Sequence, residues 1–166
     1  MKTVAGPWPF PSADVRGLQL SRRAALTGGA ALLAIRSIEP ASATPEAMRA
    51  VMRTIVGDAT VKKGRVRLDL PPLVENGNTV PMTVTVESPM TARDHVTAIH
   101  VLNEKNPQPY VISVQLTHRA GTPNFSTRIK LGDTQRVTAI AQMSDGSFWI
   151  GEQEVIVTIA ACLENF

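Results

Sequence analysis

Residues 82–86 read Met-Thr-Val-Thr-Val, and residues 66–70 read Val-Arg-Leu-Asp-Leu. In both stretches apolar and polar residues alternate one by one, so successive side chains would point to opposite faces of an extended chain. This period of two is typical of a β-strand with one face toward a core and the other toward water. The two stretches therefore predict a β-rich fold.

Further apolar-rich runs of strand length follow, separated by short segments rich in Gly, Pro, Asn and Asp. They cover residues 96–102, 111–116, 125–131, 136–143 and 148–159. One of the separating segments, residues 75–78, reads Glu-Asn-Gly-Asn and predicts a turn, because an Asn-Gly pair accepts positive φ. Seven short strands about 10–13 residues apart are typical of an all-β, immunoglobulin-like β-sandwich.

One helix is expected before the first strand. Thr44 suits a helix N-cap, Pro45 suits the first helical position, and Glu46 favours the positive end of the helix dipole. Apolar residues then recur every three or four positions and form one stripe, after which Gly57 is a plausible stop. The stripe consists of Ala47, Met48, Val51, Met52, Ile55 and Val56. The pattern predicts a single helix near residues 46–56.

The charge of the chain is unevenly distributed. The whole sequence has a net charge of +3, but residues 1–43 alone account for it, with five basic and two acidic side chains. Residues 44–166 hold 12 of each sign and are neutral. Without a basic stripe in this larger part, nucleic acid is not an expected partner. The content of 43% hydrophobic and 19% charged residues also argues against a disordered chain.

The N-terminal segment has the features of an export signal. The pair Arg22 and Arg23 precedes an apolar run at residues 24–35, which is too short to span a bilayer, and Ala41-Ser42-Ala43 matches a cleavage site. Paired arginines before a mildly apolar run favour twin-arginine export. We therefore expect residues 1–43 to be a signal peptide and the mature chain to be periplasmic, with no membrane attachment after cleavage. An N-terminal membrane anchor or a soluble helix is the alternative.

The usual catalytic and metal-binding groupings do not stand out. His95 and His100 are five residues apart, so on a strand they would face opposite sides and could not bind one metal together. His118 is the third histidine, and structural or surface roles are expected for all three; no Gly-rich phosphate loop or G-x-S-x-G motif is present. We expect no metal, no cofactor and no self-contained catalytic site.

Cys162 is the only cysteine of the chain, so it has no disulfide partner within it. It follows the last predicted strand, and residues 160–166 beyond that strand would form a free arm. Seven extended residues reach about 20–25 Å. A thiol on such an arm can hold a group covalently and deliver it to another protein's active site. The alternative is that Cys162 packs as a small hydrophobic residue in a segment that docks a partner.

With these features in place, residues 72–148 resemble the SoxY sulfur-carrier family, and the similarity extends over about residues 46–162. The matching pieces are Val74-Glu75-Asn76-Gly77, Val80-Pro81, Val84 to Glu87, Ser88-Pro89-Met90, Ile99-His100, Asn106-Pro107, Ser126-Thr127-Arg128-Ile129 and Met143-Ser144-Asp145-Gly146. The resemblance implies an immunoglobulin-type sandwich that pairs with SoxZ, a second β-sandwich. It also implies a C-terminal arm that carries sulfur intermediates of thiosulfate oxidation as cysteine adducts.

The arm itself departs from the family pattern, which ends Gly-Gly-Cys-Gly-Gly. Here the residues are Ala160, Ala161, Cys162, Leu163 and Glu164, which resembles SoxY-related paralogues with an Ala-Ala-Cys-Ile-Glu arm. Only Cys162 carries over as a functional residue. Alanine has less backbone freedom than glycine, Leu163 adds bulk beside the sulfur, and Glu164 adds negative charge. A stiffer arm that is less suited to an anionic cargo indicates another cargo or other partner enzymes.

The sequence therefore predicts three parts: the signal peptide at 1–43, the sandwich with its helix at 44–159 and the cysteine arm at 160–166. The expected function is that of a periplasmic carrier that holds a sulfur-containing group on Cys162 for enzymes that load and unload it. A non-covalent binding or scaffold subunit of a periplasmic complex is the alternative. An enzyme with its own turnover is the least supported class.

Overall fold

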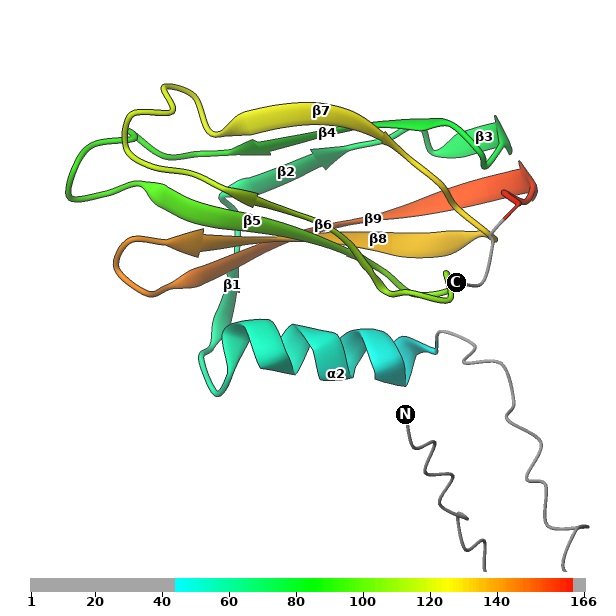
Figure 1. Ribbon diagram of the computed structural model, residues 1–166, viewed down its shortest axis with the longest axis horizontal. Coiled ribbons are helices and arrows are strands. Elements are labelled where there is room, and N and C mark those ends of the chain that lie inside the picture. The colour runs from blue at the N-terminus through cyan, green and yellow to red at the C-terminus, as the bar shows by residue number, and fades with distance from the viewer. Residues whose placement is uncertain (1–43, 163–166) are drawn as a thin grey trace, which may run out of the picture. The chain divides into compact units, whose positions relative to one another are not determined.

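Two packed sheets form the body of the protein in the computed structural model, which describes residues 44–162 (Figure 1). The larger sheet has the strand order β1-β9-β8-β5-β6, with β3 paired to the far end of β9, and the smaller sheet has the order β2-β4-β7. The strands are β1 Val61–Lys63, β2 Val66–Asp69, β3 Leu73–Asn76, β4 Val80–Val86, β5 Val96–Asn103, β6 Tyr110–Gln115, β7 Asn124–Ile129, β8 Gln135–Met143 and β9 Phe148–Ile159. The predicted β-sandwich is confirmed.

The alternating stretches lie where their pattern predicts. In β4, Met82, Val84 and Val86 are buried between the sheets, whereas Thr83 and Thr85 on the other face are only half-buried. The inward residues of β5 and β8 complete the same core, and it contains residues from both sheets. Hydrophobic burial on one face of each strand therefore holds the two sheets together.

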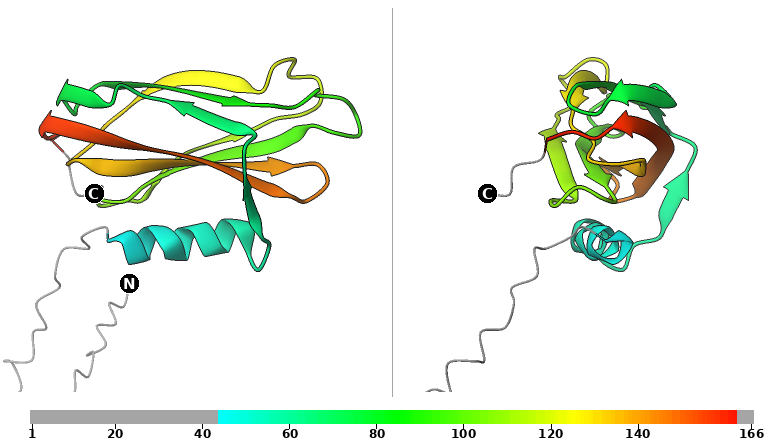
Figure 2. Two further views of the ribbon diagram at one scale, coloured as in Figure 1. Left: turned by 180° about the vertical axis from the view of Figure 1, so that it is seen from behind. Right: turned by 90° about the vertical axis from the view of Figure 1, so that its right-hand side faces the viewer.

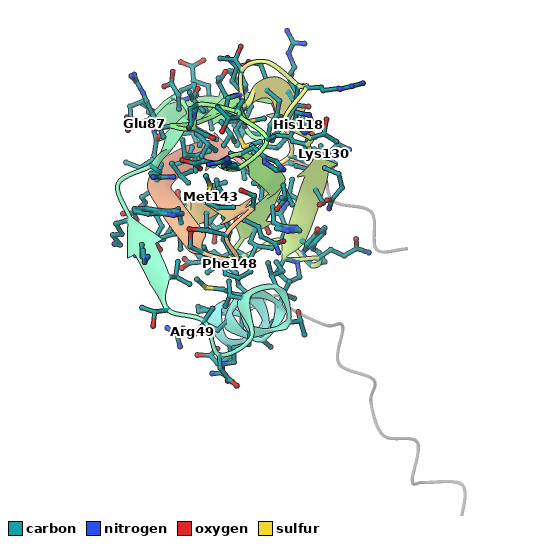
Figure 3. The ribbon with its side chains drawn as sticks, turned by 90° about the vertical axis from the view of Figure 1, so that its left-hand side faces the viewer. Arg49, Glu87, His118, Lys130, Met143 and Phe148 are labelled. Carbon is teal, nitrogen blue, oxygen red and sulfur yellow. The ribbon has the colours of Figure 1, made fainter. Side chains whose placement is uncertain are left out.

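The helix α2 (Pro45–Val56) covers part of the outer face of the larger sheet (Figure 2). It begins as predicted, because the Thr44 hydroxyl accepts a hydrogen bond from the Ala47 amide at 3.2 Å, and Gly57 ends it at φ 59°. Its apolar stripe packs against a second cluster on the sheet, made of Leu102, Ile140, Phe148 and Ile150. Figure 3 shows Phe148 between the helix and the sheet, and Met143 inside the sandwich.

Two short strands were not predicted. Both β1 and β3 pair in parallel with β9, with Lys62 opposite Trp149 and Val74 opposite Val157. Segments of three and four residues are too short to show a period, and a parallel pairing depends on a neighbour that is far away in the sequence. The sequence therefore predicts seven strands, and the described residues form nine.

His100 lies on the outer face of β5, where its Nδ1 and the Tyr110 hydroxyl are hydrogen-bonded at 2.8 Å. Burial lowers the pKa of His100 below its ordinary value of 6.5. As the pH falls below 6.5, the unfolded chain takes up this proton more readily than the folded protein. The free energy of unfolding should therefore decrease between pH 7.5 and pH 5.5, and His100→Gln should reduce that decrease.

Urea denaturation of the mature protein at both pH values measures the effect. The carboxyl groups of Glu46, Asp133 and Asp145 have lowered pKa values and stay ionised throughout this range, so they do not interfere. Ser113→Gln, at the exposed position paired with His100 on β6, keeps the imidazole and should retain the wild-type decrease. An unchanged decrease in His100→Gln would contradict the assignment.

Candidate functional site

Cys162 lies three residues beyond the end of β9, and its side chain is exposed. It is the only cysteine of the chain. The end of β9 lies beside β3, at the end of the sandwich opposite the β8–β9 hairpin (Figure 1). A lone exposed thiol at this position is accessible to other molecules.

The segment that leads to Cys162 is held on the sandwich. We call residues 159–162 the arm root. The amide of Ala161 donates a hydrogen bond to the carbonyl of Leu131 at 3.0 Å, and Ala161 is only 8% exposed. The amide of Cys162 donates to Oδ1 of Asn78 at 3.1 Å. The prediction that the chain is free from Ala160 onward is therefore wrong for the first residues of the arm, because tertiary hydrogen bonds hold them.

Gly77 lies directly beneath the arm root. Its amide donates to the carbonyl of Ile159 at 2.8 Å, and its carbonyl accepts from the amide of Leu131 at 2.8 Å. A Cβ atom at this position would lie 2.2 Å from the Leu131 oxygen and 2.9 Å from the Ala161 nitrogen. The predicted turn at 75–78 is present, but its explanation by positive φ is wrong, since Gly77 is not among the left-handed glycines of the described chain. Glycine is needed here for the close approach of three backbone segments.

A buried asparagine organises the loop that carries Leu131. Asn106 donates from Nδ2 to the Lys130 carbonyl at 2.8 Å, and its Oδ1 accepts from the Gly132 amide at 3.0 Å and from Nε2 of Gln135 at 2.8 Å. These bonds satisfy a polar side chain that is 9% exposed. The position of the Leu131 carbonyl, and with it the arm root, is therefore determined by contacts between distant loops.

Three large aliphatic side chains are exposed on β3 and β9. Leu73, Ile156 and Ile159 are 58%, 53% and 65% exposed. Leu73 is paired with Ile156 across β3 and β9, and Ile159 is the last residue of β9. Ile159 is therefore an exposed apolar side chain of the arm root itself, whereas Leu73 and Ile156 form an exposed apolar pair further back along β3 and β9.

The family model described as "Sulfur oxidation protein SoxY" matches residues 52–162, which is most of the chain. The match ends at Cys162. The chain belongs to the SoxY family. The predicted resemblance to this family is confirmed. The closer relationship to paralogues with an Ala-Ala-Cys-Ile-Glu arm stays a prediction.

Solved structures agree with this membership at the level of the fold. The sulfur carrier protein SoxY from Chlorobium limicola f thiosulfatophilum aligns at 24% identity and a TM-score of 0.57, over 68% of this chain and 96% of that chain. A superoxide reductase (neelaredoxin) variant from Ignicoccus hospitalis aligns at 18% identity and a TM-score of 0.51, over 69% and 92%. At such identities these likenesses show the fold alone. A search of curated proteins finds no match.

Within the matching piece Val74-Glu75-Asn76-Gly77, Asn76 pairs with Ile159 and the Gly77 amide donates to the Ile159 carbonyl, so both residues contact the arm root. The sequence alone indicates only a turn there. Asn78 and Leu131 were not predicted as site residues, and no local signal marks them. Three of the predicted site residues lie in the arm root: Ala160, Ala161 and Cys162. Ala160 is exposed. The predicted positions Leu163, Glu164, Arg22 and Arg23 lie outside the described residues.

The three histidines of this SoxY chain do not meet at one site. His95 lies near His118, with ring centroids 5.8 Å apart, and His100 is paired with Tyr110 instead. Within residues 44–162, no group of three or more His, Cys, Asp or Glu side chains is arranged to hold a metal ion. In the same range, no helix has both the length and the apolar character needed to cross a membrane. The arm root is the candidate site.

Proposed function

We propose that this SoxY-family chain is a covalent carrier that holds a sulfur-containing group on Cys162 and presents it to partner enzymes. The observation that carries the proposal is the position of the only cysteine, whose side chain is exposed at the end of an arm root that is hydrogen-bonded to the sandwich. Family membership supports the same function, as does the likeness in fold to a protein described as a sulfur carrier.

The chemistry suits a carrier better than an enzyme. A thiolate can form a covalent bond to sulfur and release it again by exchange with another thiol or by attack on the adduct. Within residues 44–162, the hydrogen bond of Cys162 is made by its backbone amide to Asn78, which leaves the exposed thiol available for exchange. We assign loading and unloading to separate partner enzymes, as the resemblance to the family implies.

The composition of the arm favours a cargo other than that of the Gly-Gly-Cys-Gly-Gly arms. Ala161 is buried against the sandwich, so its methyl group contributes to packing that a glycine would lack. Glu164, two residues beyond Cys162, adds a negative charge that repels an anionic adduct by about 1 kcal/mol at a few ångströms in water. We infer that a neutral or less highly charged sulfur group is carried, or that the partner enzymes compensate this charge.

The remaining parts of the proposal concern the cellular setting. The pair Arg22 and Arg23 and the Ala41-Ser42-Ala43 site support export of the folded chain to the periplasm by the twin-arginine route. A SoxZ-like β-sandwich subunit is the proposed stable partner, by analogy with the family. Enzymes that load and unload Cys162 are the proposed transient partners.

The test is the intact mass of the mature protein isolated from native periplasm, first without reductant and then after reduction. A reducible mass increase that maps to Cys162 is expected, and its size identifies the carried group. In the alternative, a non-covalent scaffold subunit, Cys162 would be packed and unmodified. An unmodified chain whose thiol reacts with iodoacetamide only after unfolding would overturn the carrier proposal.

A further inference from the structure

The backbone of the carrier cysteine is held by a side chain from another part of the chain. Oδ1 of Asn78 accepts the hydrogen bond from the Cys162 amide at 3.1 Å, although 84 residues separate them in the sequence. The Cys162 side chain itself remains exposed. The bond therefore restrains the peptide of residue 162 without covering the thiol.

The side chain of Asn78 is oriented for this contact by its neighbour. Oδ1 of Asn76 accepts hydrogen bonds from the backbone amide of Asn78 at 2.9 Å and from Nδ2 of Asn78 at 3.0 Å. Because Nδ2 is directed to Asn76, the carbonyl oxygen of the same amide is left to face Cys162. The acceptor is thus preorganised by two bonds that do not involve the arm.

This acceptor is also fixed relative to the last strand. Asn76 is the end of β3 and pairs with Ile159 of β9, and the Gly77 amide donates to the Ile159 carbonyl at 2.8 Å. The same strand that leads to the cysteine therefore positions the residue that holds it. Rotation of the Asn78 side chain away from Cys162 would also break its bond from Nδ2 to Asn76, whereas movement of the Cys162 amide requires the loss of one exposed hydrogen bond.

We propose that Asn78 is a positioning residue that holds Cys162 in a docked state at the end of the sandwich, from which the arm is released for delivery. The inference rests on the proposed carrier function. In the docked state the sulfur is three bonds from an anchored amide nitrogen, so it stays at the protein surface. Release of the bonds at Cys162 and Ala161 adds three residues, about 10 Å, to the reach of the arm.

Two features suit this bond to a reversible role. It joins exposed groups, and a hydrogen bond between exposed groups has a small net free energy, so the docked and released states can both be populated. It is also independent of the sulfur chemistry, because the donor is the backbone amide. A cargo on the sulfur therefore leaves the donor available, and docking can operate in the loaded and the unloaded carrier.

Amide hydrogen exchange of the mature protein, measured residue by residue by NMR, tests the proposal. Asn78→Ala should accelerate exchange of the Cys162 amide by about three- to tenfold, the loss expected for one exposed hydrogen bond. The variant keeps the bond from its own backbone amide to Asn76, so the turn is retained. Asn78→Asp keeps an acceptor oxygen and should restore most of the protection. Thr79→Ala, at the exposed next position, is the matched control and should exchange like the wild type.

A second readout follows the side chain. A nitroxide label attached to Cys162, the only cysteine, should gain a larger mobile fraction in Asn78→Ala than in Thr79→Ala, at an unchanged midpoint of thermal unfolding. A purely structural role of Asn78 would shift that midpoint without selectively changing the Cys162 amide. Equal exchange rates and equal label mobility in Asn78→Ala and the wild type would overturn the proposal.

These measurements need no cargo, so their failure is distinguishable from failure of the carrier function. Selective acceleration of Cys162 exchange, together with an unmodified native protein whose thiol reacts with iodoacetamide only after unfolding, would support the docked state and contradict the carrier proposal. A reducible adduct on Cys162 together with unchanged exchange would support the carrier and overturn the role of Asn78.

Discussion

Cys162→Ser is expected to abolish the reducible mass adduct of the native protein completely and to give cells the phenotype of a full deletion. Serine has nearly the shape of cysteine but lacks the thiolate that forms and exchanges sulfur bonds. The backbone amide of residue 162 and its bond to Asn78 are retained in this variant, so the substitution isolates the sulfur. Intact-mass measurement of periplasmic protein and growth on the sulfur compound that the adduct identifies are the two readouts.

Thr79→Ser provides the control, because it changes an exposed side chain near the arm root and leaves the thiol intact. This variant should carry the adduct at the wild-type level. If Cys162→Ser supports wild-type growth, the thiol is dispensable and the chain acts as a non-covalent scaffold. The unfolding midpoint of Cys162→Ser should equal that of the wild type, which excludes loss of folding as the reason for lost function.

Gly77→Ala is expected to have the largest effect on the arm root of any single methyl addition. The added Cβ would lie 2.2 Å from the Leu131 carbonyl oxygen and 2.9 Å from the Ala161 nitrogen, and both neighbours are backbone atoms. The chain must therefore separate at the junction of three segments, at a cost of about 1–3 kcal/mol of the free energy of unfolding. Urea denaturation gives this loss, and faster exchange of the Ala161 amide reports the opening of the root.

Gly121→Ala is the control for the effect on the root. Gly121 lies in the loop between β6 and β7, has nothing within 4 Å of its Cβ position, and has a φ of 75°. Its substitution adds backbone strain of about 1–2 kcal/mol without a collision. Stability should decrease in both variants, but only Gly77→Ala should accelerate exchange at Ala161. If Ala161 exchange is equal in the two variants, Gly77 does not secure the arm.

Much of the fold is predictable because its signals are local. The alternation Met-Thr-Val-Thr-Val at 82–86 requires one buried and one exposed face, and the structure places Met82, Val84 and Val86 in the core. The helix at 45–56 is marked by its cap at Thr44 and its stop at Gly57. The position of Cys162 after the last strand also follows from the sequence, since the run at 148–159 is uninterrupted.

The candidate site was only partly predictable. The sequence indicates Cys162 and a turn at Asn76-Gly77, but nothing local connects the two, because 84 residues separate Cys162 from Asn78. The parallel pairing of β3 with β9 brings them together. The same pairing changes the interpretation of Gly77, from a residue that permits a left-handed turn to one that permits three backbones to meet.

The sequence by itself determined the strands that alternate, the helix with its caps and the one thiol available for chemistry. These depend on neighbours within a few residues, whose periodicity and backbone preferences act locally. Only the tertiary structure decided where the arm begins to be free. The carbonyl of Leu131 and the side-chain oxygen of Asn78 come into hydrogen-bonding distance of the arm only after both sheets have packed. The restraint on Ala161 and Cys162 therefore depends on tertiary contacts and cannot be recognised in the sequence of the arm.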